Sequence, residues 1–369
     1  MIIFWGLIAA LLSFTLTWWI KNYCVKNKVA LAPVRDRDLH TKPTPRLGGV
    51  AIVISFLVVM LVLALFSADA NTDFGFPFAI WGLSIDKRLL GIIAATIFMS
   101  AIMIFDDLRG LKPFVKLGTQ IVSAIILIAS GVGILYLNNP FGLVINLDSL
   151  RIPLQIGQSV YHIVFWADLI FLLWFLLLTN ATNFIDGLDG LATTLATICA
   201  VTLLFVSSAN SQAATALLAT VFAGAMIGFL PWNLPRAKIF LGDTGSMFLG
   251  LMLAVLTVIT GGKLATILLV FGLVIIDALY VVAKRLLLGK NPFSSPDQSH
   301  IHHRFLKARF SPVSTLITVS AISLLFALAA LLTAGRTKIY LIIVLIVLSF
   351  VMFIALDLKA KKLKTKNVS

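Results

Sequence analysis

The sequence contains no glutamate: all fifteen acidic side chains among its 369 residues are aspartates. Charge of either sign is scarce, at 12 % of residues, and only two cysteines are present. The scarcity of charge excludes an ordinary water-soluble domain. Cys24 and Cys199 lie at opposite ends of different apolar segments, which argues against a disulfide-stabilised scaffold. Without an internal repeat or low-complexity tract, a single domain is the simplest interpretation.

Long apolar segments fill most of the chain. Hydrophobic residues make up 60 % and the mean hydropathy is +1.05, which places the chain among integral membrane proteins. A helix needs about 20 apolar residues to cross a bilayer. On this criterion the sequence predicts eleven spans: 1–20, 48–67, 88–105, 114–136, 159–179, 188–208, 212–231, 244–260, 264–284, 313–333 and 338–357. We therefore expect an all-α integral membrane protein, with one polytopic domain over 1–357 and a basic tail over 358–369.

The distribution of positive charge predicts the orientation of these spans. The first span is followed, not preceded, by lysines, so we expect it to be retained rather than cleaved as a signal peptide, with the N-terminus outside. With eleven spans, 23 of the 29 lysines and arginines and the C-terminus then fall in the cytoplasm. The net charge of +14 thus indicates contact with anionic membrane lipid rather than nucleic acid. On the outer side, alternation over 142–156 predicts a small hairpin.

Aspartates gather at the ends of predicted spans on the cytoplasmic side. Asp106 and Asp107 end one span, and adjacent carboxylates repel each other unless a cation, a proton or nearby bases compensate. Asp243 lies between two glycines just before another span. Carboxylates are preferred ligands of hard divalent cations, so these residues are candidates for a metal site. The alternatives are a solvated turn for the pair and a helix N-cap for Asp243.

Segment 179–191 interrupts an apolar stretch with two carboxamides and two Asp-Gly steps. Its candidate binding residues are Asn183, Asp186 and Asp189. Glycine permits unusual backbone angles and close approach of a ligand, and the N-terminus of the following helix offers N–H groups to an anion. The segment therefore predicts a binding turn; a tight interhelical turn with capping Asn and Asp is the alternative.

Basic groups lie on the same side. Three histidines occur together in a cytoplasmic loop: His300, His302 and His303. No cysteine or glutamate completes a zinc site there, so contact with phosphate or nucleotide is favoured over zinc binding or a purely structural loop. Three lysines are weaker candidates for binding phosphate: Lys42, Lys112 and Lys116.

Asp277 lies inside a predicted span, where an ionisable group is energetically costly and usually faces the bundle interior. Lys284 or Arg285, further along the same segment, is its expected partner. We expect a structural role, or an indirect role behind the residues that contact a ligand.

Carboxylates, histidines and lysines on one membrane face together indicate metal-assisted phosphoryl chemistry at the bilayer surface. A transporter of an anionic substrate is the alternative from another class. Transporters place charges near the bilayer midplane and often carry inverted repeats, whereas here the charges crowd one membrane rim and no repeat is visible. A scaffold protein would not require this grouping of side chains.

Five ordered motifs carry a resemblance to a known family: RDLHTKPTPRLGG, DDLRGLKPFVK, NATNFIDGLDGLA, KIFLGDTGSMFLG and SHIHH. Together they resemble the polyprenyl-phosphate N-acetylhexosamine-1-phosphate transferases, over residues 35 to 305. The His-Ile-His-His string is most similar to the bacterial enzymes that move N-acetylglucosamine 1-phosphate from UDP-GlcNAc to undecaprenyl phosphate. A sister transferase for another UDP-N-acetylated sugar is the nearer alternative.

The resemblance implies attack by the lipid phosphate on the β-phosphorus of a UDP-sugar, with release of UMP. It implies Mg²⁺, or Mn²⁺ in its place, held by Asp243 and also contacted by Asp107. Asp106 and Asp107 would hold or deprotonate the lipid phosphate. Contacts to the nucleotide and sugar would come from the Asp-Gly segment and the histidines.

The resemblance also implies a setting and one departure. The setting is the bacterial inner membrane, where the product would initiate an envelope polysaccharide such as the O-antigen of lipopolysaccharide, and a homodimer is suggested by family likeness alone. Many relatives have an Asp-Asp-x-x-Asp pattern, whereas the fifth position here is Gly110. Any role of a third carboxylate in that motif is therefore lost in this chain.

Overall fold

The computed structural model describes residues 2–32, 43–66, 77–80, 83–138, 142, 144–156, 159–261, 263–289 and 299–365. Within these residues the helices are α1 (Ile2–Asn27), α2 (Gly48–Phe66), α3 (Lys87–Arg109), α4 (Pro113–Ala129), α5 (Phe165–Ile185), α6 (Leu191–Ala209), α7 (Ala213–Asn233), α8 (Gly242–Ile259), α9 (Leu264–Val270), α10 (Gly272–Leu287), α11 (Ile301–Lys307), α12 (Pro312–Leu332) and α13 (Arg336–Thr365). The strands are β1 (Leu31–Ala32), β2 (Thr44–Pro45), β3 (Pro77–Ile80), β4 (Leu83–Asp86), β5 (Tyr136–Asn138), β6 (Val144–Asn146), β7 (Arg151–Ile156) and β8 (Ser159–Val164).

The helices form a membrane bundle. In the described part of the chain, nine helices are long and apolar enough to cross a membrane, and α9 with α10 makes a tenth if this bent pair is one span. The helix α4 is apolar but has only 17 residues. The expected all-α membrane architecture is confirmed, while the number of spans and their orientation remain predictions.

The helices α7 and α8 lie at the centre of the bundle. Each is buried over 83 % of its apolar stretch, whereas α1 and α13 are buried over only 22 % and present their remaining side chains to the surroundings. Small residues allow close packing at the centre, since a Cβ atom on Gly224 of α7 would overlap the carbonyl oxygen of Gly6 on α1. The helix α8, which carries Asp243, is therefore held firmly from several sides.

The expected straight span 264–284 is broken. The axes of α9 and α10 differ by 84°, with the break between Val270 and Gly272. A break frees backbone carbonyls, which must find other partners inside a membrane. Ser323 of α12 supplies one, because its buried hydroxyl donates a hydrogen bond to the Val270 carbonyl at 2.7 Å.

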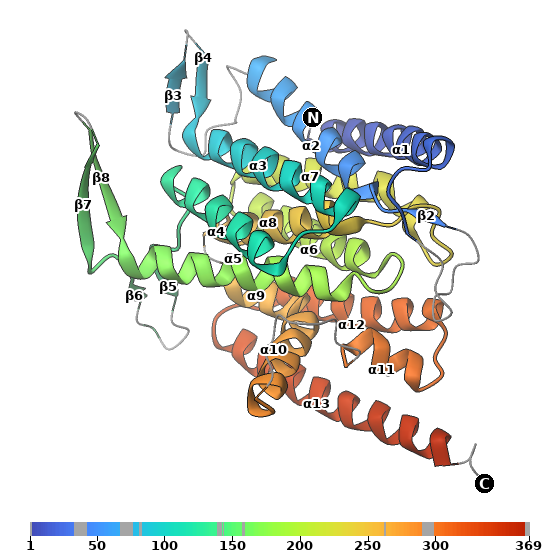
Figure 1. The fold of residues 1–369 in the computed structure, drawn as a ribbon. Helices are drawn as coiled ribbons and strands as arrows, with labels where there is room; N and C mark the ends of the chain where they lie inside the picture. Colours follow the sequence, from blue (N-terminus) through green and yellow to red (C-terminus); the bar gives the residue numbers. More distant parts are fainter. Residues whose placement is uncertain are drawn as a thin grey trace.

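Short antiparallel hairpins lie at the ends of the bundle, and Figure 1 shows β3–β4, β5–β6 and β7–β8 together at one end, opposite β2. The prediction of one hairpin over 142–156 is wrong in its pairing. That segment supplies β6, which pairs with the earlier β5, and β7, which pairs with the later β8. The strand β8 also takes residues 159–164 from the start of a predicted span, so α5 begins at Phe165.

Candidate active site

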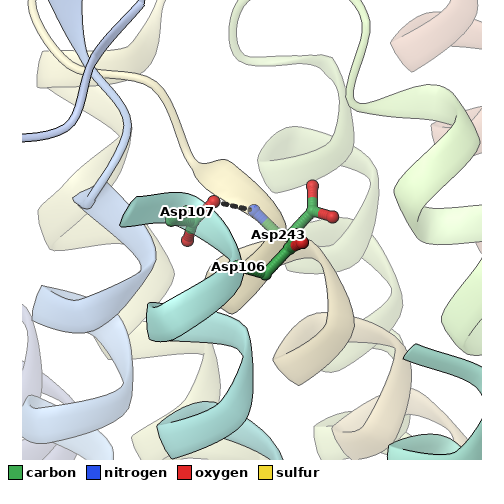
Figure 2. A group of neighbouring side chains, drawn as sticks. All are labelled: Asp106, Asp107 and Asp243. Atoms are coloured by element: carbon green, nitrogen blue, oxygen red, sulfur yellow. Dashed lines mark hydrogen bonds between the residues drawn. The ribbon is translucent and has the colours of Figure 1, made fainter. Parts of the chain in front are cut away.

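Three carboxylates converge at the end of the bundle opposite these hairpins. Asp106 and Asp107 lie in the last turn of α3, and Asp243 lies in the first turn of α8 (Figure 2). One carboxylate oxygen from each lies within 4.8 Å of the others. Asp243 is not the N-cap of α8, because that position is Leu241. Among the described residues, this is the group whose acidic or histidine side chains could together hold a metal ion.

Lys116 neutralises part of this cluster. Its ammonium nitrogen lies 2.6 Å from Oδ2 of Asp106 and 2.5 Å from Oδ2 of Asp243. The side chain reaches the carboxylates from the first turn of α4, because α3 and α4 are joined by a short turn that Asp106 stabilises by accepting a hydrogen bond from the Leu111 N–H at 2.6 Å. The ammonium thus lies between two carboxylates, where a metal ion or a phosphate would also be attracted.

Asp107 joins α3 to the start of α8. Its carboxylate accepts a hydrogen bond from the backbone N–H of Asp243 at 2.8 Å (Figure 2). It also accepts from Thr244, from the backbone N–H at 3.0 Å and from the hydroxyl at 2.6 Å. A carboxylate at a helix N-terminus satisfies free N–H groups there. Gly242 permits this approach: its φ is +73°, and a Cβ atom would overlap the Arg46 carbonyl and crowd Asp107. Asp107 is therefore fixed in direction by three donors.

The Asp-Gly segment lies beside the cluster. Asn183, near the end of α5, donates to Oδ1 of Asp243 at 3.3 Å and to the Ser246 hydroxyl at 2.9 Å. Asp186 ends α5, and the turn that follows passes Gly190, whose φ is +75°. Asp189 instead contacts the loop before α8. Its carboxylate accepts hydrogen bonds from the backbone N–H groups of Arg236 at 3.2 Å and Ala237 at 3.0 Å. Asp189 thus braces the loop that leads to Asp243.

Carboxylates lie close to one another in this region. Burial raises the pKa of the half-buried Asp186 well above its usual range, and three neighbouring carboxylates, of which Asp243 contributes most, raise it further. Close carboxylates have this effect when no cation offsets them. Hard divalent cations prefer such oxygen donors. The donor set of Asp106, Asp107 and Asp243 therefore fits a divalent cation such as Mg²⁺.

The histidine segment packs against the Asp-Gly turn. His302 lies on α11 and is 1 % exposed, and a Cβ atom on Gly187 would overlap its Nε2 atom. Burial lowers the pKa of His302 well below its usual range, as do the two neighbouring histidines, so its ring is neutral. The centroids of the His303 and His302 rings are 4.2 Å apart, and His303 is less buried than His302. The three rings do not converge on one point, which disfavours zinc.

Asp277 has a different partner from the one the sequence suggested. Its Oδ2 atom lies 2.9 Å from Nδ1 of His300, and both side chains are buried. The prediction that Lys284 or Arg285 pairs with Asp277 is therefore wrong. Those bases lie in the last turn of α10, two turns away from Asp277 along the helix.

Of the remaining predicted lysines, Lys112 is exposed at the N-cap of α4, and Lys42 lies outside the described residues. One hydrogen bond between two helices was not predicted from the sequence. Asn180 of α5 donates to the Gln120 side-chain oxygen at 2.8 Å, and Gln120 is 2 % exposed. Gln120 lies one helical turn after Lys116, so this link fixes α4 where its lysine meets the carboxylates. The glutamine inside an otherwise apolar predicted span could have indicated this contact.

Comparison with known proteins places the chain in a family. Residues 89–261 match the model of glycosyl transferase family 4. The chain is 31 % identical over 329 residues to decaprenyl-phosphate N-acetylglucosaminephosphotransferase of Mycolicibacterium smegmatis, covering 82 % of this chain and 74 % of the relative. It is 30 % identical over 344 residues to undecaprenyl-phosphate alpha-N-acetylglucosaminyl 1-phosphate transferase of Thermotoga maritima, covering 93 % and 94 %. It is 31 % identical over 293 residues to phospho-N-acetylmuramoyl-pentapeptide-transferase of Staphylococcus aureus, covering 78 % and 84 %.

The chain therefore belongs to glycosyl transferase family 4, and the family recognised from its five motifs is confirmed. It is a multi-pass membrane member of that family.

The contact between the Asp-Gly turn and the histidines can be tested by Gly187→Ala. We expect this substitution to displace His302 and to destabilise the protein by about 1–3 kcal/mol, because a buried ring must move. The measurement is thermal unfolding of the detergent-purified protein. Gly118→Ala in α4 is the matched control, since a Cβ atom there meets nothing within 4 Å; equal effects of the two substitutions would contradict the packing described here.

Proposed function

We propose that the protein transfers N-acetylglucosamine 1-phosphate from UDP-GlcNAc to undecaprenyl phosphate, forming undecaprenyl-diphospho-GlcNAc and UMP. An oxygen of the lipid phosphate attacks the β-phosphorus, and the bond from that phosphorus to the bridging oxygen breaks. UMP leaves with the bonding electrons. Two relatives are named as transferases of N-acetylglucosamine phosphate to a polyprenyl phosphate, which supports this donor and acceptor class.

The observation that carries the proposal is the convergence of Asp106, Asp107 and Asp243, with the Lys116 ammonium between Asp106 and Asp243. Bringing a phosphate to a diphosphate accumulates negative charge, so most of the catalytic stabilisation must be electrostatic. We propose Mg²⁺, or Mn²⁺, as the cofactor, with Asp243 as the main ligand and Asp107 as the second. When bound, such an ion neutralises charge on the phosphate oxygens.

Asp106 and Lys116 are the proposed contacts for the acceptor. Asp107 already accepts three hydrogen bonds, whereas Asp106 accepts one from a backbone N–H and pairs with the mobile ammonium of Lys116. Asp106 is therefore the better placed of the two to take a proton from the lipid phosphate. Lys116 can turn from the carboxylates to an incoming phosphate, and Lys112 and Lys42 are weaker candidates for binding it.

The Asp-Gly turn and the histidines are the proposed contacts for the UDP-sugar. Asn183 links this turn to Asp243, so a donor bound at the turn would lie beside the carboxylate cluster. Asp186 and His303 are the candidates for direct contact. Asp189 and His302 are engaged in or packed against neighbouring segments, and we assign to them the shaping of the site.

The proposed setting is the bacterial cytoplasmic membrane, with the site on its cytoplasmic face. The product would initiate a cell-envelope polysaccharide such as the O-antigen of lipopolysaccharide, and the protein would act as a homodimer. Bacterial relatives and the predicted excess of positive charge on this face support the setting.

A different UDP-N-acetylated sugar is the second candidate donor. One relative at 31 % identity is named phospho-N-acetylmuramoyl-pentapeptide-transferase. Relatives at this level of sequence identity are therefore named for more than one donor. The absence of glutamate from this chain separates its histidine motif from that branch, whose triple histidine is followed by glutamate.

The donor can be identified by measuring UMP release from purified protein with undecaprenyl phosphate and Mg²⁺ across a panel of UDP-sugars. We expect release with UDP-GlcNAc and its loss on addition of a chelator that removes divalent cations. Release with another sugar alone would move the protein to the sister activity. If folded protein released UMP with no sugar in the panel, the transferase proposal would be wrong.

A further inference from the structure

Asp277 and His300 form a buried polar pair outside the carboxylate cluster. The Asp277 side chain is 3 % exposed and that of His300 is 8 % exposed, and the carboxylate Oδ2 lies 2.9 Å from Nδ1 of the ring. Asp277 comes from α10, the second part of the broken span, while His300 is the N-cap of α11. The contact therefore ties the histidine segment to a membrane helix.

The pair also fixes the ring of His300. The hydrogen bond between Nδ1 and the Asp277 carboxyl group holds the ring in one orientation, whichever of the two groups donates. In that orientation the ring stacks on Phe184 of α5, with centroids 5.0 Å apart. The His300 ring also lies parallel to the ring of His302, with an interplanar angle of 3° and a centroid distance of 6.2 Å.

These stacking contacts connect His300 to both segments that form the proposed donor site. Phe184 is the neighbour of Asn183, which donates to Asp243. His302 packs against Gly187 of the Asp-Gly turn. Asp277 is thus connected through His300 to the two segments that would contact a UDP-sugar, whereas Lys116 and Asp106, which would contact the lipid phosphate, lie further along these contacts, beyond Asp243.

Buried polar pairs contribute little net stability, because removing both groups from water offsets their attraction. They can instead define one geometry. We propose that Asp277 is a positioning residue that acts through His300 to hold the UDP-sugar site in its binding geometry, without contacting substrate itself. This inference rests on the proposed transferase function.

The test is a double-mutant cycle on the full-length, detergent-purified protein. Asp277→Asn keeps the shape of the side chain and removes its charge, and His300→Phe keeps the stacking and removes the hydrogen bond. UMP release is measured while UDP-GlcNAc and undecaprenyl phosphate are varied in turn. Asp148→Asn, in an exposed ion pair with Arg151, is the matched control.

We expect Asp277→Asn to raise the KM for UDP-GlcNAc roughly tenfold, as for loss of a charged hydrogen bond. The KM for undecaprenyl phosphate stays within about twofold, and Asp277→Asn has no further effect in the His300→Phe protein. If Asp277→Asn alone does not fold, the double variant is compared with wild type and shows the same selective rise.

Equal changes in the two KM values, or an undiminished Asp277→Asn effect in the His300→Phe protein, would overturn the positioning role while leaving the transferase function intact. A folded wild-type protein that releases no UMP would instead overturn the proposed function, and this inference with it.

Discussion

We expect Asp243→Asn to reduce turnover by roughly a thousandfold at saturating Mg²⁺ and to leave the fold intact. The Asp243 carboxylate meets the Lys116 ammonium and the Asn183 amide, while its backbone N–H donates to Asp107, so a change of its charge is felt by both basic and acidic groups of the proposed site. Asparagine keeps its shape but loses the negative charge that would hold a metal ion. The expected magnitude is that of removing a main electrostatic contact from an active site.

The effect is measured as kcat for UMP release, with thermal unfolding as the check on folding. Asp148→Asn removes a carboxylate from an exposed pair on β-hairpin residues far from the site and should change kcat by less than about twofold. If Asp243→Asn, correctly folded, kept near wild-type turnover, Asp243 would not be the main metal ligand.

Lys116→Gln has two opposite expected effects. Turnover falls roughly a hundredfold, because one fixed cation is lost where phosphate must meet diphosphate. The apparent affinity for divalent cations rises by about tenfold, because the ammonium no longer competes with them for Asp106 and Asp243. Added Mg²⁺ should accordingly raise the unfolding temperature of Lys116→Gln more than that of wild type.

Titration of UMP release and of thermal unfolding with Mg²⁺ separates the two effects. Lys26→Gln, at the exposed end of α1, is the control for loss of one positive charge. Weaker metal binding in Lys116→Gln would mean that the lysine supports the cation site rather than sharing its carboxylates.

Hydropathy predicted the helices well because a span needs a long uninterrupted apolar run. It failed where an apolar run changes conformation. Residues 159–164 were assigned to a span, yet they pair with β7, since β-branched residues fit a strand as well as a helix. The break at 271 depends on Ser323, which lies on another helix and satisfies the freed carbonyl; no local pattern carries that information.

Residue type and position predicted the carboxylate cluster, because Asp106, Asp107 and Asp243 all lie at span ends where hydropathy places them on one face. Local sequence could not supply the partners of Asp277 and Asp189. Asp277 was expected to pair within its own helix, but His300 lies 23 residues away along the chain. The Asp189 carboxylate accepts hydrogen bonds from backbone N–H groups of a loop, which its local sequence does not indicate, and its contact with nucleotide stays a prediction. The partners of both residues lie on segments that are distant in sequence and are brought close only by the tertiary fold.

The most direct test of the proposed reaction follows the β-phosphorus of the donor. Purified protein is given UDP-GlcNAc labelled with ³²P at the β-position, together with undecaprenyl phosphate and Mg²⁺, and the lipid and aqueous products are separated. We predict label in the lipid fraction, in equal amount to the unlabelled UMP released. Label that stays in the aqueous fraction as UDP, with sugar alone transferred to the lipid, would contradict sugar-1-phosphate transfer.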